Sequence, residues 1–169
     1  LWNDMYNAMG QYGILSCGAT MNNNSNVDVT GDVPTGCDSD YMISVTNTTR
    51  NDSKNSGAAY GATTIDLGAP GTQILSTYTG GGTSLLSGTS MASPHVAGAI
   101  GFMHASMSVG LAYLFRTAPD QGAIIIKQII LDGTDPLSSL NGITVSGGRL
   151  NLYNAAVMSM EYLAADSLD

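Results

Sequence analysis

The sequence predicts an α/β fold built on a mostly parallel sheet, forming one domain or part of one. Short apolar runs alternate along the chain with longer stretches of helical periodicity, as expected for strands joined by crossover helices. The 169 residues, 43% of them apolar, suffice for a hydrophobic core. Only 11% of the residues are charged and 21 are glycine, which indicates tight packing and many turns.

The expected elements follow from local patterns along the chain. Apolar residues at helical spacing predict a first helix over 2–9, and the apolar run 14–19 predicts a strand buried on both faces. The polar, Asp-rich segment 20–40 predicts a long ordered loop or a set of turns. Further strands are expected at 41–46, 65–67, 73–75 and 83–85. Further helices are expected at 89–106, 109–116, 122–131 and 152–163.

Charge and composition exclude several classes of function. Thirteen acidic and five basic residues give a net charge of −8, and so few scattered bases cannot bind a nucleic-acid backbone. The most apolar stretch, 91–105, is shorter than the ~20 residues of a membrane span and predicts a core helix instead. Cys17 and Cys37 allow one disulfide or two buried thiols. The chain starts with neither Met nor a signal peptide, so we expect it to be part of a longer protein.

The strongest sign of chemistry lies in segment 88–98, GTSMASPHVAG. Glycine and small hydroxyl residues precede an apolar helix, and Pro94 is tolerated there only in a first turn, which places Ser90 at the helix N-terminus. Unpaired backbone amides and the helix dipole favour an anion at that point. Ser90 is therefore either an N-cap, the commonest role of serine at such a position, or a nucleophile whose own amide helps to hold an oxyanion.

The order of residues bears on the choice between these two roles. Both histidines, His95 and His104, follow Ser90, and no acidic residue lies between Ser90 and His104. None of the known orders of the serine, histidine and aspartate in a triad can be completed in this chain. His95 is expected to be a buried structural histidine, because its side chain leaves the helix away from Ser90, and His104 is expected on a helix face. The base of a nucleophilic Ser90 would therefore lie upstream of residue 1.

Segment 88–98 resembles the serine signature of the subtilisin-like proteases, with the serine, the proline and the Ala-Gly pair in place. Segments 66–71 and 147–151 are similar to that family's Ala-Pro-Gly turn and to the end of its catalytic domain. The resemblance covers residues 1–158 as the C-terminal part of that domain and leaves 159–169 as the end of the last helix and a tail. It implies a three-layer αβα fold whose catalytic Asp and His belong to an absent upstream half.

The resemblance also implies roles for individual residues. Ser90 would be the nucleophile of a serine endopeptidase, and the side chain of Asn22 would donate to the oxyanion, although Met21 replaces the glycine that usually precedes this asparagine. Ala19, Thr20 and Met21 would line the pocket for the substrate residue before the scissile bond. The substrates would be proteins or peptides. The complete protein is expected to be a monomer and, like most of the family, secreted.

No cofactor is expected to be required, although calcium is common in the family. Four acidic residues in one loop could supply oxygen ligands, but their spacing matches no calcium motif, and a solvated acidic loop is the favoured interpretation: Asp28, Asp32, Asp38 and Asp40.

Three other classes of protein are weighed against the protease. A sedolisin-like peptidase shares the Gly-Thr-Ser signature but places an Asp where Asn22 stands. An α/β-hydrolase is disfavoured because segment 88–92 lacks its second glycine and no histidine follows a later Asp. A catalytically inactive, protease-like binding domain would differ from an enzyme in the upstream segment, which would lack the Asp and His.

Overall fold

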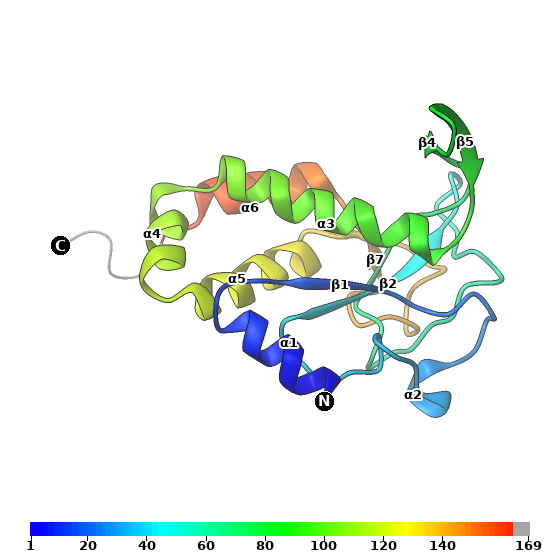
Figure 1. The fold of residues 1–169 in the computed structure, drawn as a ribbon, viewed down its shortest axis with the longest axis horizontal. Coiled ribbons are helices and arrows are strands. Elements are labelled where there is room, and N and C mark those ends of the chain that lie inside the picture. Colours follow the sequence, from blue (N-terminus) through cyan, green and yellow to red (C-terminus); the bar gives the residue numbers. More distant parts are fainter. Residues whose placement is uncertain (164–169) are drawn as a thin grey trace.

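The structure, a computed structural model, describes residues 1–163 (Figure 1). The helices of this part are α1 (Trp2–Gly10), α2 (Val27–Thr30), α3 (Thr89–Ser106), α4 (Val109–Thr117), α5 (Pro119–Asp132) and α6 (Leu152–Glu161). The strands are β1 (Ser16–Ala19), β2 (Met42–Thr48), β3 (Leu67–Pro70), β4 (Ile74–Tyr78), β5 (Gly82–Leu86), β6 (Asp135–Pro136) and β7 (Gly148–Arg149).

A five-stranded sheet in the order β1-β2-β3-β7-β6 forms the centre of the molecule. Strands β1, β2, β3 and β7 are parallel, and β6 pairs antiparallel with β7 at the edge. Strands β4 and β5 form a separate antiparallel hairpin that projects from the body just before α3 (Figure 1). The mostly parallel α/β sheet predicted from the sequence is therefore confirmed.

Helices flank the sheet in the three-layer arrangement expected of the fold. α3 and α6 lie together on one side, with α3 packed across β1, β2 and β3, and α1 lies on the opposite side (Figure 1). All seven residues of β2 are buried, because this strand lies inside the sheet and is covered on both faces. Its residues Ile43 and Val45 join the main core with side chains from α3, α4, α5 and α6.

Strand β1 differs from the prediction, which had it buried on both faces. Only Gly18 is buried, and the other three residues of the strand are half-buried. The reason is its place at the edge of the sheet, where only β2 pairs with it. The helix expected at 122–131 begins earlier, at Pro119, because proline fits the first helical position, where no amide donor is needed.

The segment 20–40 is the ordered loop that its polar composition predicts. It contains the single-turn helix α2, whose N-cap Asn26 accepts a hydrogen bond from the amide of Asp28, and a cis peptide bond before Pro34. The last helix, expected to reach residue 163, ends at Glu161. The rest of the expected tail, 164–169, lies outside the described residues, and the boundary at 158 stays a prediction.

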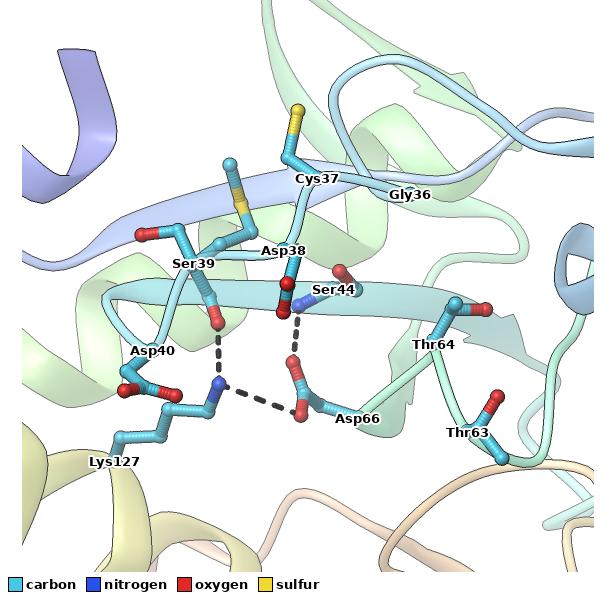
Figure 2. A pocket seen from close by; sticks show the side chains of 11 residues that line it. Gly36, Cys37, Asp38, Ser39, Asp40, Ser44, Thr63, Thr64, Asp66 and Lys127 are labelled. Carbon is cyan, nitrogen blue, oxygen red and sulfur yellow. Dashed lines mark hydrogen bonds and ion pairs between the residues drawn. The ribbon is translucent and has the colours of Figure 1, made fainter. Parts of the chain in front are cut away.

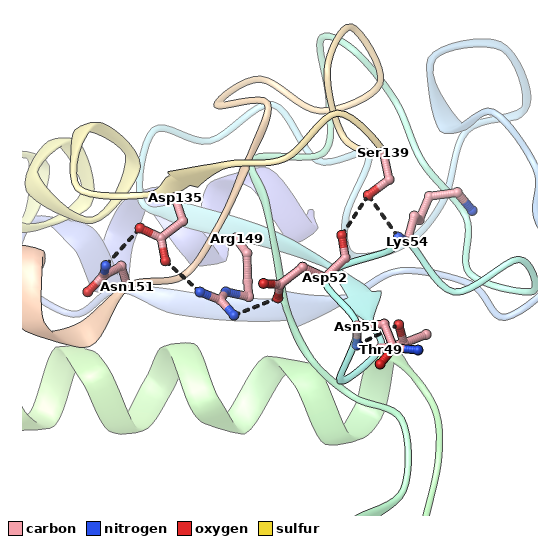
Figure 3. Close-up of polar contacts among 8 residues, drawn as sticks. All are labelled: Thr49, Asn51, Asp52, Lys54, Asp135, Ser139, Arg149 and Asn151. Atoms are coloured by element: carbon pink, nitrogen blue, oxygen red, sulfur yellow. Dashed lines mark hydrogen bonds and ion pairs between the residues drawn. The ribbon is translucent and has the colours of Figure 1, made fainter.

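An arginine joins the end of the sheet to the loop that follows β2 (Figure 3). Arg149 donates to Asp135 at 2.5 Å and to Asp52 at 2.6 Å, and Asn151 donates to Asp135 at 2.8 Å. The hydrogen bonds from Asn151 and Arg149 lower the pKa of the Asp135 carboxyl. The turn around Asp52 is thus tied to two strands that are distant in sequence, and the residues that follow it are held in place.

Within residues 1–163, no single helix is both long enough and apolar enough to cross a membrane. α3 and α4 together reach that length and hydropathy, but they meet at a bend of 105°. Both cysteines are free thiols, so no disulfide joins them, and each is half-buried rather than buried as expected. Burial raises the pKa of the Cys17 thiol to about 12.

Candidate active site

Ser90 is exposed at the N-terminus of α3, as the sequence predicts. The helix begins at Thr89 and its N-cap is Gly88, so Ser90 is the second helical residue and the interpretation of Ser90 as an N-cap is wrong. Pro94 lies in the second turn rather than in the first. Because proline has no amide hydrogen, Pro94 cannot donate the helical hydrogen bond to the carbonyl of Ser90. Water can bind this carbonyl instead, since this side of the helix is exposed.

Contacts with the ends of two strands fix the entry into α3. The amide of Gly88 donates to the carbonyl of Gly71 at 2.8 Å, just beyond β3. A Cβ atom on Gly71 would lie 2.7 Å from the Gly88 oxygen, so this close approach requires glycine. The buried hydroxyl of Thr89 donates to the carbonyl of Thr20, just beyond β1. Ser90 therefore lies at the carboxyl edge of the parallel strands, where α/β folds bind their ligands.

Asn22 lies beside the start of α3. Its Oδ1 accepts a hydrogen bond of 3.1 Å from the amide of Thr89, across 67 positions of sequence. With Oδ1 bound in this way, the side-chain amide is oriented and its Nδ2 is left to donate elsewhere. The amide of Ser90 belongs to the first helical turn and has no intrahelical acceptor. The arrangement thus brings two kinds of donor, a side-chain amide and a helix N-terminus, to one place.

A cavity of about 310 Å³ lies next to Ser90. It is lined by Ser90 and by residues of β4 and the first turns of α3, namely Ile74, Leu75, Ser76, Met91, Pro94 and His95. Its walls are largely apolar and open to solvent on the exposed side of α3. Room for a further side chain therefore exists directly against the serine.

The three residues expected to line a substrate pocket do not line this cavity. Ala19 ends β1 and is half-buried, while Thr20 is 2% exposed and its hydroxyl donates to Asp32. The side chain of Met21 packs against a small cluster around Val27. The role of all three in substrate binding stays a prediction.

The expectation of a buried His95 is wrong. His95 is exposed, and its Nδ1 lies 2.8 Å from the carbonyl of Met91, one helical turn back. The buried stripe of α3 runs through Ala92, Val96, Ala99 and Met103, and His95 lies at its flank. His104 is also exposed, as expected for a helix-face residue. Among the described residues, no hydrogen bond joins either histidine to Ser90.

Two of the four carboxylates in the acidic loop are already bound by protein donors. Asp28 accepts from the amides of Thr63 and Thr64 and from the hydroxyl of Thr64, and these bonds outweigh its burial and lower its pKa. Asp32 accepts from Thr20 and Thr35. Residues 1–163 contain no group of three or more His, Cys, Asp or Glu side chains arranged for a metal ion. Calcium binding by this loop stays a prediction.

A polar cavity that the sequence reasoning missed lies under the loop 36–40 (Figure 2). It has a volume of about 360 Å³, and Lys127 of α5 and Asp66 approach each other inside it, 3.6 Å apart. Lys127 also donates to the carbonyl of Met42, and Asp66 accepts from the amide of Ser44 at 2.7 Å. Burial raises the pKa of Asp66, and Lys127 opposes that rise. The sequence feature that could have predicted this ion pair is the single lysine, Lys127, within a mostly apolar stretch of helix.

Replacing Lys127 by Met is expected to destabilise the protein at neutral pH by about 2–3 kcal/mol, since the desolvated Asp66 carboxylate loses its cation. Because the native pKa of Asp66 lies above its unfolded value, the native carboxyl takes up its proton first as the pH falls. A neutral Asp66 needs no cation, so the loss in free energy of unfolding caused by Lys127→Met should become smaller at acid pH. Urea unfolding of both proteins from about pH 4 to about pH 8 measures the deficit as a function of pH.

The matched control for this variant is Arg116→Met, which removes one positive charge from an exposed position on the neighbouring helix α4. This control is expected to change the free energy of unfolding by less than about 0.5 kcal/mol. A Lys127→Met deficit that stays constant or grows toward acid pH would show that Lys127 does not compensate the charge of Asp66.

Comparison with known proteins found relatives both by sequence and by structure. The family model described as "Subtilase family" matches residues 2–132. Thermitase from Thermoactinomyces vulgaris is 39% identical over 113 residues, which cover 67% of this chain and 35% of thermitase. Subtilisin-like protease 7 from Arthroderma gypseum is 35% identical over 150 residues, which cover 86% of this chain and 34% of that protein. The chain thus spans about a third of the length of these relatives.

Solved structures share the fold at lower sequence identity. A protease structure from Pseudoalteromonas arctica matches with a TM-score of 0.75 at 23% identity. The match covers 93% of this chain and 46% of that structure. At this identity the likeness shows the fold alone, and it agrees with the layered α/β architecture described above.

Proposed function

The chain belongs to the subtilase family, and from this premise we propose that it carries the nucleophile of a serine endopeptidase. Ser90 Oγ attacks the scissile carbonyl carbon, a histidine takes the serine proton and returns it to the leaving amine, and an aspartate orients that histidine. The observation that carries the proposal is the position of Ser90, exposed at the N-terminus of α3 beside Asn22.

Asn22 and the amide of Ser90 form the oxyanion hole in this proposal. The negative oxygen of the tetrahedral intermediate accepts hydrogen bonds from Asn22 Nδ2 and from the backbone of Ser90. The bond from Thr89 to Asn22 Oδ1 supports this role, because it fixes which end of the side-chain amide faces outward. The dipole of α3, an eighteen-residue helix, favours the same charge.

The catalytic histidine and aspartate come, in this proposal, from a segment upstream of residue 1. Neither His95 nor His104 is hydrogen-bonded to Ser90 within the described residues, which supports a base from elsewhere. The cavity of about 310 Å³ against Ser90 offers space for such a side chain. The triad would then have the order Asp, His, Ser, one of the three known orders.

The substrates of the complete protein are proteins or peptides in this proposal, with the backbone around Ala19, Thr20 and Met21 forming a wall of the pocket before the scissile bond. We also propose that the complete protein is a secreted monomer, on the strength of the family resemblance. Gel filtration and fractionation of culture medium against cells test these two points.

Peptide hydrolysis by two proteins of different length tests the proposal. The complete protein is expected to cleave a fluorogenic peptide near neutral pH, and residues 1–169 alone are expected to be inactive, since they lack the base. A monomeric, proteolytically active 1–169 would rule out the upstream triad. A folded but inactive complete protein would indicate the binding domain instead, and activity confined to acid pH would indicate a sedolisin-like enzyme.

A further inference from the structure

Lys54 places its ammonium group among neutral oxygen atoms. Its Nζ donates to the carbonyl of Ala58 at 2.6 Å and, at 3.0 Å each, to the carbonyl of Asn55 and the side-chain oxygen of Asn24. It also lies 5.4 Å from the centre of the Tyr60 ring. Residues 1–163 provide no carboxylate within 4.0 Å of this nitrogen, and burial lowers its pKa. The charge is thus partly desolvated without an anionic partner, which calls for a role beyond ion pairing.

The oxygens that Lys54 binds belong to two segments that lie side by side. Segment 21–27, which carries Asn22, pairs with segment 54–60 through backbone hydrogen bonds: Asn24 N to Gly57 O, Ala59 N to Met21 O, and Tyr60 N to Ser25 O. Asn24 has a φ of 55°, in the left-handed region, so the turn after Asn22 is sharp. Lys54 joins the tip of this turn to the facing segment through a side chain.

The lysine itself is held at its backbone (Figure 3). The amide of Lys54 donates to the hydroxyl of Ser139 at 3.0 Å, and that hydroxyl donates to the carbonyl of Asp52 at 3.2 Å. The side chain of Asp52 is bound in turn by Arg149 of the central sheet. Lys54 therefore connects the turn that carries Asn22 to a fixed part of the fold.

We propose that Lys54 is a positioning residue for the oxyanion hole: by binding Asn24 and the 55–58 backbone together, it holds Asn22 against the start of α3. The inference rests on the proposed function, in which Asn22 donates to the developing oxyanion. Because Asn22 acts in the transition state, a displaced Asn22 should lower kcat and leave KM nearly unchanged.

A double-mutant cycle in the complete protein tests this inference. Lys54→Met is expected to lower kcat about 10-fold at nearly constant KM, as misplacement of a catalytic group does. In a protein that already carries Asn22→Ala, adding Lys54→Met should cost nothing further, because the group that Lys54 positions is gone. Equal losses in both backgrounds would show that Lys54 does not act through Asn22 and would overturn the inference.

Three further variants separate this role from general stability. Asn24→Gly keeps the left-handed backbone but removes the oxygen that Lys54 binds, so it should reproduce part of the loss of kcat. Lys54→Arg keeps the charge and its donors and should restore part of the activity lost in Lys54→Met. Arg50→Met removes a positive charge from an exposed site four residues away and should leave kcat within about twofold.

Amide hydrogen exchange gives a readout that does not depend on catalysis. Lys54→Met is expected to speed exchange of the Asn24 and Ala59 amides, both of which bond across the two segments, while amides of β2 keep their protection. If Ser90 is not the nucleophile, the proposed function fails, but this exchange still shows whether Lys54 holds the turn. Unchanged exchange at Asn24 would overturn the inference even in an active enzyme.

Discussion

Ser90→Ala lowers kcat for peptide hydrolysis by the complete protein about 10⁶-fold, if Ser90 is the nucleophile that we propose. The magnitude is that known for the nucleophilic serine of subtilisin, a member of the same family. The variant removes the covalent route, while the oxyanion hole and substrate binding remain and leave a residual rate above that of water. KM should change little, because the substitution removes no group that holds the substrate in the ground state. Steady-state kinetics on one fluorogenic peptide measures both constants.

Ser93→Ala is the matched control, since Ser93 is a second serine on α3 and donates to the Cys17 carbonyl at 3.1 Å. It should keep kcat within about twofold of the parent value. An active Ser90→Ala variant would remove Ser90 from the chemistry. A loss of equal size in both variants would indicate damage to the helix instead of loss of a nucleophile.

Asn22→Ala should lower kcat about 10²–10³-fold with little change in KM, because the lost donor acts on an oxygen that becomes negative only in the transition state. This range is also known from subtilisin. Asn23→Ala is the control: Asn23 is exposed, and its side-chain oxygen is bound to Ser25 within the same turn. A larger loss from Asn23→Ala than from Asn22→Ala would place the donor one residue further along the chain.

Local signals in the sequence predicted the frame of the site well. Glycine and small hydroxyl residues before an apolar stretch predict a helix start, and α3 begins at Thr89, directly before Ser90. The apolar run around Ile43 predicts a buried strand, and β2 is buried at every residue. The start of α3 and the burial of β2 depend on residues within a few positions of each other, so they can be predicted from one sequence.

Contacts between distant segments were not predictable in the same way. Lys127 meets the Met42 carbonyl across 85 positions, and the Lys54 amide meets Ser139 across another 85. Backbone carbonyls and amides are present along the whole chain, so no sequence pattern identifies which of them meets a given distant side chain. His95 was misjudged for a related reason: its burial depends on which side of α3 faces the sheet, and the apolar character of the whole helix hides that choice.

Labelling with a fluorophosphonate, followed by mass spectrometry of the peptides, tests the central claim most directly. The reagent forms a covalent bond only with a serine that is activated as a nucleophile. In the complete protein we expect the label on Ser90 and on no other serine, and we expect none in the Ser90→Ala variant. A folded complete protein that takes no label, or takes it on another serine, would contradict the assignment of Ser90.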